Sequence, residues 1–237
     1  MSIGWCLKMS DAKWYDDYYS KVNNKFSSWN LKILELIKDS YKKRLKILDC
    51  GCGDGGLLKK LAQNFKINKN YLYGIDQSKV AINKLKKQGF KNVKASNLES
   101  IPYKSNYFDI IVLAEVIEHL RDKDKVILEV YRCLKKDGLL IISFPNYLNL
   151  PWLILRLLAK FLNKPNWIIL QPYDKIYSYF GIKRYIARKG FAFIKSSGTC
   201  YLPPILYKCE AMKLSNSLSR CSLAFLSFHP VLVFKKI

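Results

Sequence analysis

Residues 47–56 read Ile-Leu-Asp-Cys-Gly-Cys-Gly-Asp-Gly-Gly, so a short apolar run is followed by a loop with four glycines. The apolar run predicts a buried strand over 46–50, and the leucines after the glycines predict a helix. Glycine lets a loop turn tightly and lets a ligand approach the main chain. A glycine loop between a strand and a helix is therefore a candidate binding site.

Asp76 adds an acid to this pattern. It follows the next predicted strand, 71–75, and comes 21 residues after Gly55. A carboxylate in that position can accept two hydrogen bonds from a ribose diol. The glycines are spaced G-x-G-x-G, whereas dinucleotide-binding folds have G-x-G-x-x-G. The sequence therefore indicates a ligand that contains a nucleoside and argues against a dinucleotide.

Predicted strands and helices alternate on both sides of the loop. Such alternation predicts a parallel sheet with helices on both faces. One or two helices are expected within 11–42, and the later part of the chain is expected to complete the same sheet. The further predicted strands are 92–95, 108–114, 139–144, 191–195 and 231–234. The further predicted helices are 79–88, a segment around 127–134 that Gly138 stops, 151–162, 178–189 and 205–218.

Three later segments, together with the glycine loop, resemble the class I S-adenosylmethionine-dependent methyltransferases. The segments are Asn97–Tyr103 with Tyr107–Asp109, Glu115–His119 and Leu134–Leu140. The resemblance covers about 100 of 237 residues, 46–146, and is to the type 11, quinone-biosynthesis O-methyltransferase-like group. It implies an α/β fold: a Rossmann-like doubly wound seven-stranded sheet, mostly parallel with one antiparallel strand, N-terminal helices and a helical insertion after strand five. It also implies a methyltransferase whose cofactor is S-adenosylmethionine.

The resemblance assigns cofactor binding to a set of residues along the strand ends. Many relatives carry an acid where this chain has Asn97, whose side-chain carbonyl can still accept a hydrogen bond from an exocyclic amine. We therefore expect weaker discrimination at that position and not a loss of binding. The expected cofactor-binding residues are Asp49, Gly51, Gly53, Gly55, Asp76, Gln77, Asn97, Leu98 and Glu115.

His119 is the candidate catalytic base, since it follows the fourth predicted strand at the edge where ligands bind in such sheets. The alternative is a histidine that only packs against the next helix. Glu115, Glu118 and His119 also resemble the metal-binding E-x-x-E-H of RNA 2′-O-methyltransferases. Those enzymes use a further histidine, which the comparable region 171–174 lacks, and His229 lies near the C-terminus. We predict no metal site, and a salt-bridged helix start is the alternative role for these residues.

Charge is the strongest compositional feature. The chain has 41 basic and 18 acidic residues, a formal net charge of +23, and residues 151–237 hold 14 of the bases and two of the acids. Anionic partners are expected from such a balance, although scattered bases can also form an ordinary solvated surface. Arg156, Lys160 and Lys164 share one face of the predicted apolar helix. The 151–170 segment is therefore a candidate contact with an anionic membrane, with an internal packing helix as the alternative.

The aromatic run Trp14–Tyr19 can fold as a lid over the cofactor or pack on the sheet edge. Seven irregularly spaced cysteines without a C-x-x-C motif predict reduced thiols. With no evident signal peptide, they favour a cytoplasmic protein, with a peripheral membrane contact as the further option.

These observations predict a single methyltransferase domain over 1–237. Its expected parts are a helical cap (1–44), a cofactor-binding half (45–146) and a substrate-side half (147–237). The expected acceptor is a small or lipid-linked molecule. An RNA methyltransferase and a catalytically silent S-adenosylmethionine-binding scaffold are the alternatives, and RNA is the less favoured partner.

Overall fold

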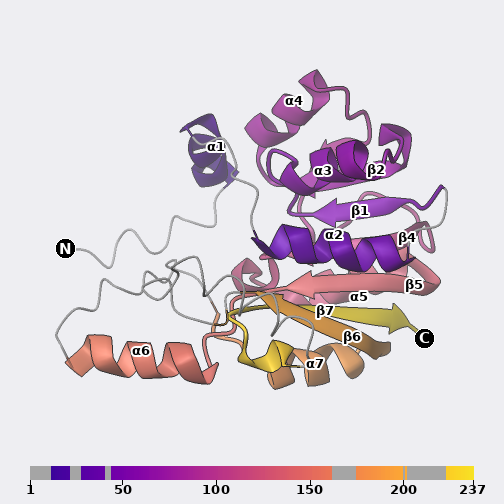
Figure 1. Ribbon diagram of the computed structural model, residues 1–237. Helices are drawn as coiled ribbons and strands as arrows, with labels where there is room; N and C mark the ends of the chain where they lie inside the picture. The colour runs from indigo at the N-terminus through magenta and orange to yellow at the C-terminus, as the bar shows by residue number, and fades with distance from the viewer. Residues whose placement is uncertain (1–11, 22–27, 41–43, 162–174, 200, 202–222) are drawn as a thin grey trace.

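The structure is a computed structural model, and it describes residues 12–21, 28–40, 44–161, 175–199, 201 and 223–237. The described residues form a seven-stranded sheet in the order β3-β2-β1-β4-β5-β7-β6 (Figure 1). The strands are β1 (Ile47–Cys50), β2 (Leu72–Asp76), β3 (Val93–Ala95), β4 (Phe108–Ala114), β5 (Leu134–Ser143), β6 (Phe191–Thr199) and β7 (His229–Lys236). The helices are α1 (Ala12–Lys21), α2 (Ser28–Ser40), α3 (Gly56–Asn64), α4 (Lys79–Lys87), α5 (Lys123–Cys133), α6 (Leu150–Phe161) and α7 (Tyr179–Ala187).

The direction of the strands agrees with the predicted fold. Strands β1 to β5 pair in parallel, whereas β7 lies antiparallel between β5 and β6. The sheet is thus mostly parallel with one antiparallel strand, as expected. Because β7 runs the opposite way, its first residues lie at the edge where the parallel strands end.

Two apolar layers enclose the sheet. Alternate side chains of β4 enter different cores: Ile110 and Val112 pack with α2, α3 and α4, whereas Ile111 and Leu113 pack with α5 and α7. This alternation follows from the two-residue period of a strand. Both faces are therefore covered, and the ends of the strands are left for binding.

Several boundaries differ from the predictions, among them both ends of β7, which was expected over 231–234 and spans His229–Lys236. The helix expected to stop at Gly138 ends at Cys133, and β5 begins at once with Leu134, which pairs with Phe108 of β4. The prediction was wrong because Leu134 fits the helical spacing yet serves as the first strand residue. The ladder shifts register after Phe108, and Asp137 has a φ of 61°. Strand β6 is also longer than predicted, and the helix expected at 205–218 lies outside the described residues.

Lys236 ties the end of β7 to the rest of the fold. Its side chain is buried, and Nζ donates to Asn106 Oδ1 at 3.0 Å and to the carbonyl oxygens of Tyr131 and Leu134, both at 2.7 Å. Burial lowers the pKa of this lysine. The three acceptors compensate for the loss of water around the ammonium group.

Three of the seven cysteines lie in the described part of the chain: Cys50, Cys52 and Cys133. All three are free and buried, in accord with the expected reduced thiols. Burial raises the pKa of each thiol, to about 11 for Cys133. They act as small apolar side chains.

Helix α6 lies to one side of the sheet (Figure 1) and is unusually apolar at its surface. The exposed fractions of six of its large apolar residues range from 38% to 86%. The six residues are Leu150, Leu153, Ile154, Leu157, Leu158 and Phe161.

Within the described ranges, no helix has the length and hydropathy needed to cross a membrane.

Candidate functional site

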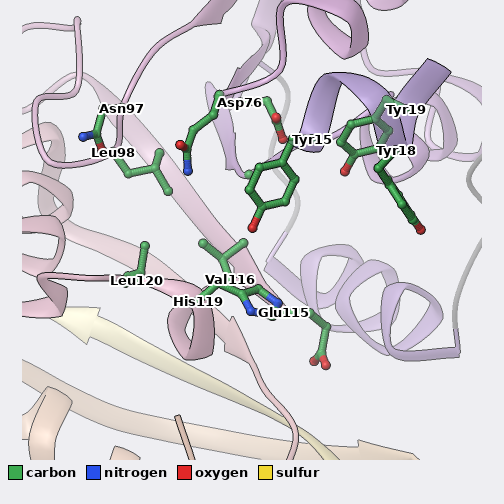
Figure 2. A pocket seen from close by; sticks show the side chains of 12 residues that line it. Tyr15, Tyr18, Tyr19, Asp76, Asn97, Leu98, Glu115, Val116, His119 and Leu120 are labelled. Atoms are coloured by element: carbon green, nitrogen blue, oxygen red, sulfur yellow. The ribbon is translucent and has the colours of Figure 1, made fainter. Parts of the chain in front are cut away.

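Two adjoining cavities lie where the parallel strands end, with volumes of about 230 and 190 Å³. Tyr19, Gly51 and Glu115 border both, so the cavities meet at these residues. In Figure 2, Asn97 and Leu98 stand at one end of the first cavity and Tyr18 and Tyr19 at the other. The first cavity is lined by Tyr15, Tyr18, Tyr19, Gly51, Asp76, Gln77, Asn97, Leu98, Glu115, Val116, His119 and Leu120. The second is lined by Tyr19, Trp29, Asn30, Asp49, Gly51, Cys52, Gly53, Gly56, Leu57, Ala114 and Glu115.

The glycine loop needs glycine for two different reasons. Gly51, Gly53 and Gly55 all have a left-handed backbone, with φ of 75°, 52° and 85°, which side-chain-bearing residues rarely adopt. A Cβ atom on Gly51 would come within 2.5 Å of Val116 Cγ2 in the cavity wall. Gly55 borders neither cavity, and a Cβ there would collide with Leu85 of α4. Gly55 thus lies against Leu85 of α4, and the cofactor contact expected for it stays a prediction.

Asp76 fastens the loop to the end of β2. Its Oδ2 accepts a hydrogen bond from Gly53 N and its Oδ1 one from Ser78 N, both at 2.8 Å. Burial raises the pKa of this carboxyl, and the two backbone donors oppose that effect. A carboxylate has about four lone-pair sites. Asp76 can therefore hold the loop and still accept hydrogen bonds from a diol in the first cavity.

Replacing Asp76 with alanine is expected to weaken S-adenosylhomocysteine binding by about 10–150-fold, because a hydrogen bond to a charged group is worth about 1.5–3 kcal/mol. Calorimetric titration measures the change. Asp76→Asn is the matched control, since it keeps one carbonyl acceptor and should lose less. Wild-type affinity in Asp76→Ala would contradict the assignment.

The second cavity presents hydrogen-bond acceptors. Asp49 is 3% exposed, and burial together with nearby Asp76 raises its pKa to about 7. The buried Asn30 Oδ1 has no hydrogen-bond partner among the described residues. An unpartnered buried acceptor is costly unless a ligand or water supplies a donor. This wall therefore suits the ammonium end of an amino acid.

Asn97 and Gln77 occupy the expected places in the first cavity. Asn97 Oδ1 accepts a hydrogen bond from Glu99 N at 3.0 Å, which closes a tight turn. One lone pair of that oxygen is thus already used by the protein. The weaker discrimination expected of Asn97 stays a prediction.

Helix α1 contributes three tyrosines to the first cavity, as the lid hypothesis requires, and Figure 2 shows the Tyr15 hydroxyl directed toward Val116 and His119. The helix is held by Asp16, whose Oδ1 accepts hydrogen bonds from Ser78 Oγ at 2.5 Å and Val80 N at 3.0 Å. The bond from Ser78 is the main reason that the pKa of Asp16 is lowered. Asp16 thus joins α1 to the start of α4.

Asp16→Ala is expected to weaken S-adenosylhomocysteine binding by about 3–10-fold although Asp16 lines neither cavity. The loss corresponds to about one hydrogen bond that positions the lid. Asp17→Ala, one residue away and exposed, is the matched control. An equal effect of both changes would mean that overall charge is responsible, and the lid attachment would then be refuted.

His119 borders the first cavity, and its Nε2 lies 3.6 Å from Oε1 of the buried Glu118. Glu115 has a φ of 55° and precedes the short 3₁₀ turn Ile117–His119, so the three residues do not share one face of a helix. Among the described residues, no three or more His, Cys, Asp or Glu side chains gather closely enough to hold a metal ion. Glu115 is instead paired elsewhere.

The partner of Glu115 is His229, which the sequence did not single out as a site residue. His229 Nδ1 lies 2.9 Å from Glu115 Oε2, and Ser143 Oγ donates to Glu115 Oε1 at 2.8 Å. The Trp29 ring covers the imidazole, with centroids 4.4 Å apart. One signal could have pointed to His229. An antiparallel last strand begins at the edge where the parallel strands end, so its first residues lie near the binding site.

Comparison with known proteins agrees with this geometry. Residues 48–142 match a family model described as a methyltransferase domain. The ubiquinone/menaquinone biosynthesis C-methyltransferase UbiE of Campylobacter jejuni is 31% identical over 135 residues, covering 52% of this chain and 57% of that protein. Norajmaline N-methyltransferase of Rauvolfia serpentina is 30% identical, covering 51% of this chain and 42% of that protein. The chain thus spans about half the length of the curated relatives it matches.

The fold is shared with solved structures. One is an S-adenosylmethionine-dependent methyltransferase from Thermotoga maritima, described as a possible histamine N-methyltransferase. Its TM-score is 0.60 at 18% identity, covering 88% of this chain and 89% of that one. Residues 48–142 therefore carry a methyltransferase domain of the class I S-adenosylmethionine-dependent superfamily. The cofactor of this domain is S-adenosylmethionine.

Proposed function

We propose that this chain transfers a methyl group from S-adenosylmethionine, in line, to a small or lipid-linked acceptor. The observation that carries the proposal is the pair of cavities that meet at Gly51 and Glu115, with Asp76 on one side and Asp49 on the other. This arrangement provides carboxylates for both polar ends of one extended cofactor. The domain division proposed with it is a cap over 1–44, a cofactor half over 45–146 and a substrate half over 147–237.

The residues of the chain have separate tasks in this proposal. The bound cofactor supplies an activated methyl group on a sulfonium, so the protein mainly positions the reactants and excludes water. Asp76 binds the ribose hydroxyls, and Tyr15, Tyr18 and Tyr19 cover the cavity. His119 accepts the proton when the acceptor must lose one.

The names of the relatives bear on the acceptor. They include a ubiquinone/menaquinone biosynthesis C-methyltransferase and norajmaline N-methyltransferase, so the family resemblance does not favour O-methylation. Quinones with isoprenoid tails are apolar, and the exposed leucines of α6 offer an apolar surface. We favour a lipid-linked acceptor reached at an anionic membrane through the 151–170 segment.

The membrane proposal predicts that the protein sediments with anionic lipid vesicles and is released by salt, because surface charges are screened beyond about 8 Å at physiological ionic strength. Changing Arg156, Lys160 and Lys164 together to glutamine should release most of the protein, since each base near such a surface contributes about 1 kcal/mol. The matched control is the change of Lys86, Lys87 and Lys91 to glutamine. These lysines are exposed at and beyond the end of α4, so the change alters net charge equally and should have little effect on vesicle binding.

The alternative is an RNA methyltransferase, which the net charge of +23 favours. In that case vesicles should not retain the protein. Single-stranded RNA should bind with a salt slope that falls by about 0.7 for each phosphate contact removed. Retention by neither ligand would refute both surface partners. Binding of S-adenosylhomocysteine without transfer to any acceptor would support a silent scaffold.

A further inference from the structure

Three strands deliver side chains to one point at the carboxyl edge of the sheet. Glu115 follows the end of β4, Ser143 ends β5, and His229 begins β7, which is antiparallel to β5. Residues Ser143 and Val231 are paired across β5 and β7, so His229 lies just beyond the end of that ladder. The three residues come from distant parts of the chain and meet only because of this topology.

The carboxylate of Glu115 is held by both neighbours. Ser143 Oγ binds Oε1 at 2.8 Å, and His229 Nδ1 lies 2.9 Å from Oε2. The backbone is fixed as well, because Glu115 N donates to Ser143 O and Oγ at 3.1 and 3.2 Å. A left-handed φ of 55° on a residue other than glycine costs about 1 kcal/mol or more and persists only where the surroundings enforce it.

Among the described residues, Glu115 carries the only carboxylate that borders both cavities. The cavities hold the two halves of the cofactor in the proposed function, so their junction is where the reacting sulfonium belongs. The Trp29 ring lies against His229, tilted by 31°, and Trp29 borders the second cavity, which closes this corner on the side of α2. Each carboxylate oxygen keeps a lone pair beyond the bond it already accepts.

We propose that Glu115 binds the hydrogen-bond-donating group of the methyl acceptor, an amine or a hydroxyl, beside the transferred methyl group. His229 is a positioning residue in this proposal: it orients the carboxylate and does not touch the acceptor. An acceptor with a carboxylate or phosphate at the reacting position would be repelled by Glu115. The proposal rests on the proposed function, because it takes the junction of the cavities to be the reaction site.

Two cofactor analogues test this without knowledge of the acceptor. S-adenosylhomocysteine has no group in place of the transferred methyl, whereas sinefungin has a carbon that bears an ammonium group in place of the methylated sulfonium. The ratio of their affinities, measured by calorimetry, therefore reports on a hydrogen-bond acceptor near the reacting position. In Glu115→Gln we expect the relative affinity for sinefungin to fall by about 10–100-fold, the range for a charged hydrogen bond.

His229 variants separate positioning from packing. His229→Phe keeps a ring against Trp29 but removes the donor to Glu115, and the relative affinity for sinefungin should fall by about 3–10-fold. His229→Asn restores an N–H near the position of Nδ1 and should recover most of the loss. Val231→Ala, which weakens the same strand from within the core, is the matched control and should leave the ratio unchanged.

The possible outcomes are distinct. An unchanged ratio in Glu115→Gln, or equal losses for both analogues in every variant, overturns the proposal and leaves the cofactor assignment intact. Failure of the wild-type protein to bind S-adenosylhomocysteine overturns the proposed function itself. A fall in the ratio in Glu115→Gln and His229→Phe, with recovery in His229→Asn, supports the proposal.

Discussion

His119→Ala is expected to slow methyl transfer by about 10²–10⁴-fold, the usual range for loss of a general base, while the affinity for S-adenosylhomocysteine stays within about twofold. The imidazole borders the first cavity, and its Nε2 lies 3.6 Å from the buried carboxylate of Glu118. A carboxylate so placed can stabilise the imidazolium that forms when the ring takes a proton.

Transfer of a labelled methyl group from S-adenosylmethionine into cell-extract acceptors measures the rate, with lipid and water-soluble products counted separately. Leu120→Ala is the matched control, since it enlarges the same cavity without removing an imidazole. Full activity of His119→Ala would exclude the catalytic role. Glu115 is paired with His229 and we predict no metal site, so we expect a chelator to leave the wild-type rate unchanged.

Asp49→Asn is expected to raise the free energy of unfolding of the ligand-free protein at pH 8 by about 2–4 kcal/mol, since one pKa unit corresponds to about 1.36 kcal/mol. In the unfolded chain an aspartate ionises near pH 3.9. In the folded protein, burial and nearby Asp76 raise the pKa of Asp49 to about 7. Between these values the folded protein binds more protons than the unfolded chain, so its stability falls as the pH rises.

The stabilising effect of neutral Asp49 is therefore complete below about pH 4 and lost as the pH passes 7. Urea unfolding at pH 5 and pH 8 measures it: the wild-type protein should lose stability between the two, and Asp49→Asn should lose less. Asp76, whose pKa is also raised, contributes a slope of the same sign in both proteins. Equal changes in the stability of the two proteins between pH 5 and pH 8 would contradict the raised pKa of Asp49. Weaker S-adenosylhomocysteine binding by Asp49→Asn would show that the acid serves cofactor binding.

Much of the first half of the chain could be predicted because its signals are local. Strand β4 was predicted over 108–114, the bounds it has in the structure, since a continuous apolar run suits a strand covered on both faces. Ser78 precedes the helix predicted over 79–88 and is a residue type that caps helices, and its side chain accepts a hydrogen bond from Ala81 N. Asp76 and the loop glycines likewise stand in a fixed order along one strand, loop and helix.

The remaining site residues depend on contacts between distant segments. Trp29 and Asn30 belong to α2, and no spacing in the sequence connects them with the loop at 51–56. His229 becomes visible as a site residue only when β7 is known to insert beside β5. The end of α5 was misplaced for another reason: helical spacing continues through Leu134, and only pairing with Phe108 assigns that residue to a strand.

The place of β7 in the sheet also sets an order of assembly. β6 precedes β7 in the chain, yet in the described sheet it pairs with β7 and no other strand. During synthesis, β1 to β5 can form their ladder as they emerge, whereas β6 must wait for a strand made after it. The corner containing Glu115 and His229 is thus completed last, after the glycine loop has its supporting strands. A nascent chain would therefore form the glycine loop and Asp76 before Glu115 meets His229.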